Sequence, residues 1–185
     1  KGVPCKHSYF LDSGLSLRGT WKDYLQDGNE RLALMMPLFH IFGQVFSHVL
    51  CFGSRNLLVL MSRPDVDALL ECIRRYKITI LLGVPTLYRT ILENDRIDQY
   101  DISSLRFCLC GGGRIPPQVA SRWREKTNYP LFQLYGATEA NLLSISPLDG
   151  SVPVTTVGWQ LPGREIKLVD PDTLEPVPEG EPGEV

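Results

Sequence analysis

Two short segments combine glycines with side chains that could bind a nucleotide. The first is the triple glycine formed by Gly111, Gly112 and Gly113, and the second is the sequence QLYGATE at residues 133–139. Each lies at the end of an apolar run that is typical of a buried strand, and each opens into a loop without bulky side chains. Because nucleotides bind at the carboxyl ends of strands in open α/β sheets, the two loops predict a nucleotide-binding crevice.

The second segment also holds groups that suit a phosphate–magnesium centre. Thr138 offers a hydroxyl and Glu139 a carboxylate, and Mg²⁺ favours carboxylates combined with phosphate oxygens. Tyr135 offers an aromatic ring, and Gly136 lets the backbone come close to a ligand.

The same residues also allow plainer interpretations. Tyr135 could be a core aromatic at a strand end, and Gly136 an ordinary turn glycine. Thr138 could be the N-cap of a helix and Glu139 the acid of its first turn. A helix start also attracts anions, so the two interpretations of Thr138 are compatible.

Apolar runs alternate with helical patterns along residues 1–150, which predicts an α/β fold with a mostly parallel sheet flanked by helices. The predicted strands are residues 31–37, 56–60, 78–82, 105–110 and 131–135. The predicted helices are residues 7–26, 42–52, 66–76, 85–94 and 117–126. The two glycine-containing segments therefore lie at the ends of the last two predicted strands.

The composition changes near Pro147, beyond which glycine and proline are dense. The alternating segment EIKLV at 165–169, followed by a turn at 170–172, predicts the first hairpin of a separate, mainly β piece. We therefore expect an α/β subdomain over residues 1–150 and the start of a β subdomain over residues 151–185.

The overall charge does not favour a nucleic-acid partner. The chain has 19 Lys and Arg residues and 21 Asp and Glu residues, a net charge of −2, so there is no basic excess to attract phosphates. The most apolar stretch, residues 41–60, is interrupted by polar residues and is not a predicted membrane span, which needs about 20 apolar residues. Membrane association stays possible without an anchor in this segment, and the sequence predicts no oligomeric state.

The cysteines favour free thiols. The chain has five, an odd number, and Cys108 and Cys110 are two positions apart on one predicted strand, where they cannot easily bridge. We expect free thiols in a reducing compartment, the cytoplasm or an organelle interior, and no zinc site because no pair has CxxC spacing. Since the sequence starts at Lys1 without methionine and ends within GEPGEV, we also expect both ends to be internal to a longer protein.

Several segments match motifs of one known family. They are KGV at 1–3 with His7, PLFHIFG at 37–43, GVPT at 83–86, GGGRIPP at 111–117, YGATEA at 135–140 and VGWQLPGREIKLVD at 157–170. In this order and spacing, the chain resembles the adenylate-forming acyl-CoA synthetases, the AMP-binding superfamily that also holds luciferases and peptide-synthetase adenylation domains. It is similar to an internal fragment of their N-terminal domain, and the last segment is similar to the start of their small β-barrel subdomain.

The resemblance implies a two-step reaction. A carboxylic acid, fatty or otherwise, attacks the α-phosphate of ATP to give acyl-AMP, and the thiol of coenzyme A then displaces AMP. Both steps need shielded phosphate charge and an aligned carboxylate more than an acid–base residue. ATP or AMP, Mg²⁺ and coenzyme A are therefore the implied cofactors and partners.

The resemblance also implies roles for individual residues. Tyr135 would stack on adenine, Thr138 would bind the α-phosphate and Glu139 would ligate Mg²⁺. His40 would border the acyl-adenylate, although a histidine among aromatics is more often a packed core residue. The other implied nucleotide-binding residues are Gly111, Gly112, Gly113, Arg114, Gln133, Leu134, Gly136 and Ala137, and the implied acyl-pocket walls are Phe42, Gly43, Val84 and Thr86.

One residue departs from the family pattern, and several family groups are absent. Arg114 replaces a small residue, and it could reach the second carboxylate of a dicarboxylic substrate or, as we prefer, point to solvent. The family's phosphate loop would lie before Lys1, and its ribose-binding aspartate and C-terminal lysine beyond Val185. We therefore expect these 185 residues alone not to catalyse adenylation.

Two alternative functions stay open. The acyl group could pass to a carrier protein, as in fatty-acyl-AMP ligases or peptide-synthetase modules, although residues 37–43 hold no acid that would bind the amino group of an amino acid. The chain could also be a non-catalytic nucleotide-binding relative, against which the intact Thr138–Glu139 pair argues.

Overall fold

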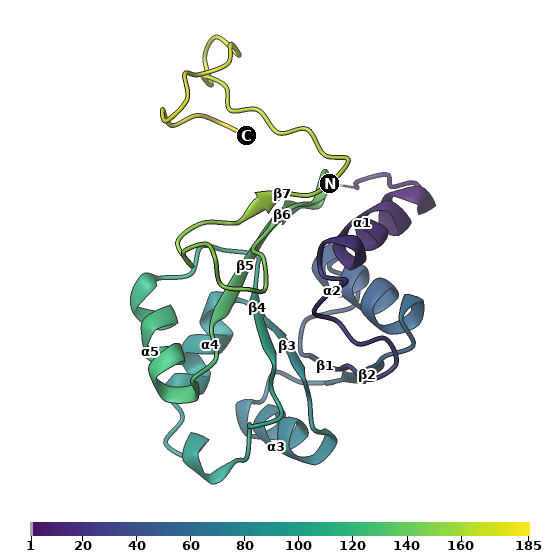
Figure 1. The fold of residues 1–185 in the computed structure, drawn as a ribbon, viewed down its shortest axis with the longest axis vertical. Coiled ribbons are helices and arrows are strands. Elements are labelled where there is room, and N and C mark those ends of the chain that lie inside the picture. The colour runs from purple at the N-terminus through teal and green to yellow at the C-terminus, as the bar shows by residue number, and fades with distance from the viewer. Residues whose placement is uncertain (1) are drawn as a thin grey trace.

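The fold centres on one seven-stranded sheet with the order β2-β1-β3-β4-β5-β6-β7 (Figure 1). The structure is a computed structural model that describes residues 2–185, so Lys1, the first residue of the KGV segment matched above, lies outside the described residues. The strands are β1 Arg31–Leu34, β2 Leu57–Leu60, β3 Ile80–Gly83, β4 Phe107–Cys110, β5 Leu131–Ala137, β6 Asn141–Ile145 and β7 Trp159–Gln160. The first five strands pair in parallel, whereas β6 and β7 add antiparallel. The prediction of a mostly parallel α/β sheet is therefore confirmed.

Helices cover both faces of the sheet and create two hydrophobic cores. The helical segments are α1 His7–Thr20, α2 Ile41–Phe46, the π-helix η1 Ser47–Gly53, α3 Val66–Tyr76, α4 Pro85–Leu92, the 3-10 turn η2 Ile97–Gln99 and α5 Pro117–Thr127. One core joins α1, α2 and η1 to alternate strand residues such as Leu82 and Leu109. The other joins α3, α4 and α5 to the intervening residues, such as Leu81 and Cys108. Both faces of the parallel strands are buried, as their continuous apolar runs require.

Local signals define several helices well. The Asp65 carboxylate accepts a hydrogen bond from the amide of Ala68 at 2.9 Å and caps α3, and Lys77 ends this helix in the left-handed conformation with φ 51°. Pro85 and Pro117 occupy the first positions of α4 and α5, where a missing N–H costs nothing. The predicted helix 66–76 is confirmed at both ends.

Other boundaries were predicted less well. The predicted helix 7–26 ends at Thr20, because Trp21, whose amide still donates to the carbonyl of Leu17, leaves the helical conformation with φ −106° and ψ 14°. The predicted helix 42–52 divides into α2 and the π-helix η1.

The interpretation of Thr138 and Glu139 as a helix start is wrong. Residues 138–140 form a turn, closed by a hydrogen bond from the amide of Ala140 to the carbonyl of Ala137 at 3.2 Å, and the chain returns as β6. Strand β6 was not predicted. It is held by hydrogen bonds with β5, in place of the local hydrogen bonds that a helix after Thr138 would make.

The last part of the chain holds little regular structure. Strand β7 pairs with β6, whereas residues 165–168 form no strand, and Val169 makes only isolated bridges to Pro176 and Glu184. In Figure 1 this yellow segment lies apart from the sheet. The predicted hairpin is therefore reduced to single bridges, and the boundary after residue 150 stays a prediction.

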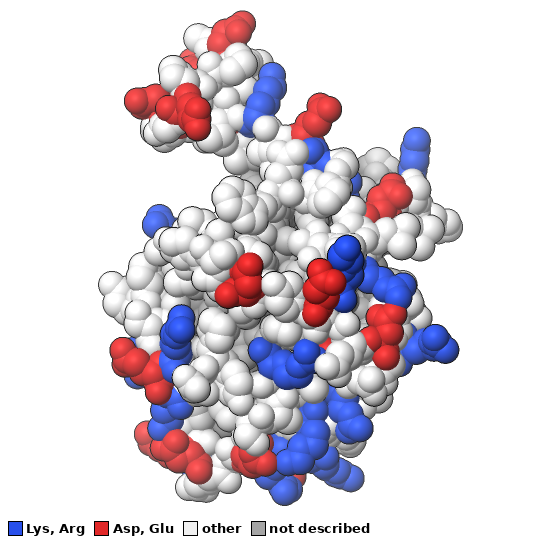
Figure 2. All heavy atoms as spheres, in the orientation of Figure 1, with Lys and Arg blue, Asp and Glu red and all other residues white. Residues whose placement is uncertain are grey.

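The surface carries mixed charge. On the face drawn in Figure 2, acidic and basic side chains are interspersed. None of the helices within residues 2–185 has the length and apolar content that crossing a bilayer requires.

A buried glutamate ties together the amino-terminal ends of three neighbouring strands. Glu30 precedes β1, is fully buried and pairs with Arg106, which precedes β4. Its carboxylate also accepts hydrogen bonds from the hydroxyl of Thr79, before β3, at 2.5 Å and from the amide of Gln26 at 3.0 Å. Arg106 donates a further bond to the carbonyl of Tyr24 at 2.9 Å. These bonds compensate the desolvation of a charge that would otherwise be costly to bury.

We predict that Arg106→Ala lowers the free energy of unfolding by about 3 kcal/mol, because it leaves the Glu30 carboxylate buried without a cation. The matched control is Arg18→Ala, which breaks the exposed pair with Asp27 and should cost less than about 1 kcal/mol. Urea denaturation of both variants measures the difference. An equally small decrease in the free energy of unfolding in both variants would contradict the proposed stabilisation by the Glu30–Arg106 pair.

Candidate active site

The predicted motifs converge at one edge of the sheet. PLFHIFG follows β1, GVPT spans the end of β3, the triple glycine follows β4, and Thr138 follows β5. Since these strands are parallel, their carboxyl ends share one edge. The chain order also reverses between β1 and β3, because β2 lies on the opposite side of β1. In open α/β sheets this switch point is where ligands bind.

A small, mainly apolar cavity opens at this edge. Its volume is about 50 Å³, enough for a few atoms. It is lined by His40, Ile41, Phe42, Val45, Phe46, Gly112, Leu134, Gly136, Ala137, Asn141 and Leu142. Of the predicted site residues, the structure thus brings His40, Gly112, Leu134, Gly136 and Ala137 together around one space, with the predicted pocket wall Phe42.

The sheet divides the predicted nucleotide-binding residues between its two faces. Leu134 belongs to the core beneath α1 and α2 and lines the cavity. Side chains alternate along a strand, so Gln133 and Tyr135 face the α3–α5 side. Tyr135 pairs across the hairpin with Ser144, whose hydroxyl donates to the carbonyl of Val157 at 3.0 Å. The ring of Tyr135 and the cavity therefore lie on opposite faces of β5.

The side chain of Gln133 is used inside the protein. It is buried, its amide nitrogen donates to the carbonyls of Val154 and Thr156, and its amide oxygen accepts from the amide of Ile115 at 3.2 Å. All the hydrogen-bonding positions of this amide are thereby occupied, except the second lone pair of its oxygen. Gln133 ties β5 to residues 154–156 and to the loop after the triple glycine, and its contact with a nucleotide stays a prediction.

Two positions near the cavity favour glycine, one for its backbone conformation and one for packing. Gly112 adopts φ 73°, which favours glycine, and lies beside Val84. A Cβ atom on Gly43 would lie 2.7 Å from the carbonyl oxygen of Pro37. Gly113 and Arg114 are exposed, and within residues 2–185 the guanidinium of Arg114 makes no hydrogen bond or ion pair.

His40 caps helix α2 at the edge of the cavity. Its ring Nδ1 accepts a hydrogen bond from the amide of Phe42 at 3.2 Å. A neutral ring with an accepting Nδ1 carries its proton on Nε2, so the other nitrogen can donate to a ligand. His40 is exposed, which excludes the alternative that it packs in the core among its aromatic neighbours. Of the other predicted pocket walls, Val84 is half-buried and Thr86 exposed, and neither lines the cavity.

The turn after β5 exposes the two groups that suit phosphate chemistry. Thr138 and Glu139 are both exposed at its tip. The phenol of Tyr9 donates to the carbonyl of Thr138, and the side chain of Asn141 donates to the carbonyl of Tyr9. Sequence analysis missed Tyr9 and Asn141, because nothing local signals a contact between residues so distant in the chain.

The donor set fits Mg²⁺ bound together with a nucleotide. Within residues 2–185 no three His, Cys, Asp or Glu side chains gather into a metal site. A protein site for nucleotide-bound Mg²⁺ needs only one or two carboxylates, because phosphates and water supply the other ligands. The exposed carboxylate of Glu139 beside the hydroxyl of Thr138 meets that requirement.

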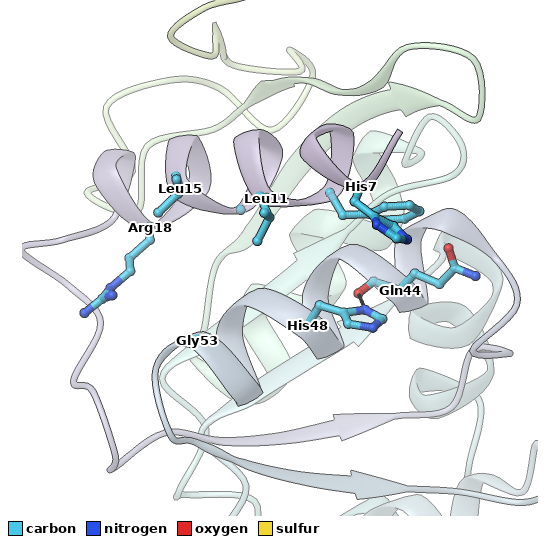
Figure 3. Close-up of a pocket in the computed structure, with 9 residues that line it drawn as sticks. His7, Leu11, Leu15, Arg18, Gln44, His48 and Gly53 are labelled. Carbon is cyan, nitrogen blue, oxygen red and sulfur yellow. Dashed lines mark hydrogen bonds between the residues drawn. The ribbon is translucent and has the colours of Figure 1, made fainter. Parts of the chain in front are cut away.

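A larger groove lies between α1 and η1, away from the strand ends (Figure 3). Its volume is about 610 Å³, and it is lined by His7, Phe10, Leu11, Gly14, Leu15, Arg18, Gln44, His48 and Gly53. Figure 3 shows His48 of η1 hydrogen-bonded to the carbonyl of Gln44, at 2.7 Å, on the floor of this groove. The groove contains none of the residues at the ends of β4 and β5, so it is separate from the predicted nucleotide site.

Comparison with known proteins gives one consistent result. A family model described as AMP-binding enzyme matches residues 1–185. A long-chain-fatty-acid–CoA ligase of Escherichia coli O6:H1 is 35% identical over 188 residues, which cover 100% of this chain and 33% of the relative. The 4-coumarate–CoA ligase-like 9 protein of Arabidopsis thaliana is 30% identical over 190 residues, with coverage of 100% and 33%.

Solved structures agree with this result. ATP-bound MatB from Rhodopseudomonas palustris superposes with a TM-score of 0.88 at 26% identity, over 98% of this chain and 35% of MatB. The amide bond synthetase McbA from Marinactinospora thermotolerans superposes with a TM-score of 0.85 at 25% identity, over 98% of this chain and 36% of McbA. The chain thus spans about a third of the length of the relatives it matches.

We predict that Gly136→Ala disrupts the hairpin that carries the Thr138–Glu139 turn. A Cβ atom would lie 2.2 Å from the carbonyl oxygen of Asn141, at a register shift in the β5–β6 pairing, and the strands would have to separate. We expect a loss of about 1–3 kcal/mol in the free energy of unfolding.

The matched control is Gly19→Ala on α1, where no atom lies within 4 Å of the new Cβ and the variant should gain about 0.5–1 kcal/mol. Denaturant titration followed by circular dichroism distinguishes the two substitutions. A Gly136→Ala protein as stable as the parent would rule out the steric role assigned to Gly136.

Proposed function

The chain belongs to the AMP-binding enzyme family, the adenylate-forming acyl-CoA ligases, and from this premise we propose that the protein that carries it is an ATP-dependent acid–thiol ligase. It would activate a carboxylic acid as acyl-AMP, release pyrophosphate and transfer the acyl group to coenzyme A. The relatives that match over the whole chain include long-chain-fatty-acid–CoA ligases, which supports coenzyme A as the acceptor.

The observation that carries this proposal is the meeting of four motifs at one sheet edge. The Thr138–Glu139 turn stands at this edge, Tyr135 faces one side of β5, and the apolar cavity with His40 opens on the other. We propose that adenine binds on the Tyr135 side and the acyl group on the cavity side. The α-phosphate, which reacts with the acid, would then lie at the turn between them.

The proposed chemistry assigns each residue a simple task. The carboxylate of the acid attacks the α-phosphorus, a bond to the α-phosphate forms, and pyrophosphate leaves. The hydroxyl of Thr138 would donate to an α-phosphate oxygen, and the Nε2–H of His40 would orient the acyl end. Glu139 would hold Mg²⁺, which shields phosphate charge when it is bound. In the second step a thiol attacks the acyl carbonyl and AMP leaves.

We propose a fatty or other apolar acid as the substrate. The cavity walls from α2 are apolar, namely Ile41, Phe42, Val45 and Phe46. A dicarboxylic acid would need a cation for its second carboxylate, and Arg114 does not line the cavity. An amino acid would need an acid for its ammonium group, and residues 37–43 hold none.

All five cysteines are free thiols, which supports a reducing environment as part of the proposal. Burial raises the pKa of the Cys51 and Cys110 thiols to about 12 and raises that of Cys108 further, so all three stay neutral near pH 7. Neutral, buried thiols are poor nucleophiles, so we assign them to packing and not to acyl transfer.

We predict that the full-length protein that carries this sequence releases pyrophosphate from ATP when an apolar carboxylic acid is supplied. A panel of fatty, aromatic and dicarboxylic acids, each with and without coenzyme A, identifies the substrate and the acceptor. Thioester formation supports the proposal, whereas acyl-AMP that accumulates with coenzyme A present would favour a carrier-protein acceptor. The 185 residues alone should show no turnover, and acid-dependent pyrophosphate release by them would refute that part.

We also predict that Glu139→Gln slows pyrophosphate release by about 100-fold, because a neutral amide would bind Mg²⁺ poorly beside the phosphates. Raising the Mg²⁺ concentration should restore part of the rate. The control Glu125→Gln changes an exposed glutamate on α5, away from the strand ends, and should leave the rate within twofold. If Glu139→Gln keeps the parental rate and the parental Mg²⁺ dependence, Glu139 is not the metal ligand.

A further inference from the structure

Helix α1 is clamped to the turn that carries Thr138 and Glu139. The hydroxyl of Tyr9 donates to the carbonyl oxygen of Thr138 at 2.5 Å. In return, the side-chain nitrogen of Asn141 donates to the carbonyl oxygen of Tyr9 at 2.8 Å. The two bonds attach one residue of α1 to both sides of the turn.

Asn141 is held rigidly enough to act as one side of this clamp. It is buried, and it adopts the left-handed conformation with φ 62°, which asparagine tolerates better than most residues. Its side-chain oxygen accepts from the amide of Leu142 at 2.8 Å, while its nitrogen reaches Tyr9. Asn141 thus holds the end of the turn next to the main-chain carbonyl of Tyr9.

A second attachment lies one helical turn further along α1. Arg164 donates from Nε to the carbonyl of Leu142 at 3.1 Å and from Nη2 to the hydroxyl of Ser13 at 2.6 Å. Ser13 is fully buried on α1, and residues four apart lie on the same face of a helix. Helix α1 therefore cannot tilt away from β6 without breaking both attachments.

Tyr9 has the properties of a permanent donor. Partial burial is the main cause that raises the pKa of its phenol, so the hydroxyl keeps its proton near neutral pH. Without this hydroxyl, the carbonyl of Thr138 would lose its donor from α1. The exposed turn would then be held by its own bond from the amide of Ala140 to the carbonyl of Ala137, at 3.2 Å.

We propose that Tyr9 is a positioning residue, which sets the location of Thr138 and Glu139 relative to α1 and to the segment that precedes it. This inference rests on the function proposed above. Reaction rates depend steeply on the alignment of reacting groups, and a displacement of about 1 Å can cost about 100-fold. A hydrogen bond from α1 to the turn is therefore expected to affect acyl-AMP formation more than acyl transfer, because only the first step acts on the α-phosphorus.

The test is Tyr9→Phe in the full-length protein, with Tyr129→Phe as the matched control. The hydroxyl of Tyr129 also donates to a main-chain carbonyl, that of Ser103 at 3.1 Å, but at the amino-terminal end of β5. We expect Tyr9→Phe to slow pyrophosphate release by roughly 10-fold, which corresponds to one lost hydrogen bond. Thioester formation from preformed acyl-AMP should stay within twofold, and Tyr129→Phe should change neither rate.

Hydrogen–deuterium exchange adds a readout that does not depend on activity. The amide of Ala140, which closes the turn, should exchange faster in Tyr9→Phe and not in Tyr129→Phe. The inference is overturned if the parent is active while Tyr9→Phe and Tyr129→Phe give the same rates, or if both half-reactions slow equally. If the amide of Ala140 exchanges faster in Tyr9→Phe but the parent shows no acid-dependent pyrophosphate release, the clamp is supported and the proposed function is refuted instead.

Discussion

The buried carboxylate of Glu30 is the constraint on which the arrangement of the site depends. It joins the segments that enter β1, β3 and β4 through Thr79 and Arg106, and a buried charge of this kind is tolerated only while all its partners stay in place. These strands are only a few residues long, so fixing their beginnings also fixes their ends. The motifs at the opposite edge, from His40 to the triple glycine, meet because the registers are set here.

The antiparallel β5–β6 hairpin determines what kind of phosphate site the edge can offer. Many nucleotide sites bind phosphate at a helix start, where free amides and the helix dipole attract the anion. Here residues 138–140 are a turn, so Thr138 and Glu139 offer a hydroxyl and a carboxylate without a helix behind them. The position of the turn must then be fixed by its neighbours, through the close packing of Gly136 on Asn141 and the contact with Tyr9.

Strand β5 also separates two environments that the linear motif places side by side. Leu134 and Gly136 face the apolar cavity beneath α2, whereas Gln133 and Tyr135 face the opposite side, where residues 154–157 pack. A single strand can therefore contact an apolar ligand group on one face and, through Tyr135, an adenine ring on the other. The chemistry we propose takes place where the two faces meet, at the end of the strand.

The sequence by itself determined the α/β fold, the bounds of α3 and the position of each motif at a strand end, because these follow from local apolar patterns and from glycine and proline positions. It also determined the family. Only the tertiary structure decided that β6 follows Glu139, that the amide of Gln133 is used internally, that His40 caps α2 and that Tyr9 contacts Thr138. Each of these depends on hydrogen bonds between partners brought together by the fold or on exposure of a side chain, and a local pattern specifies neither.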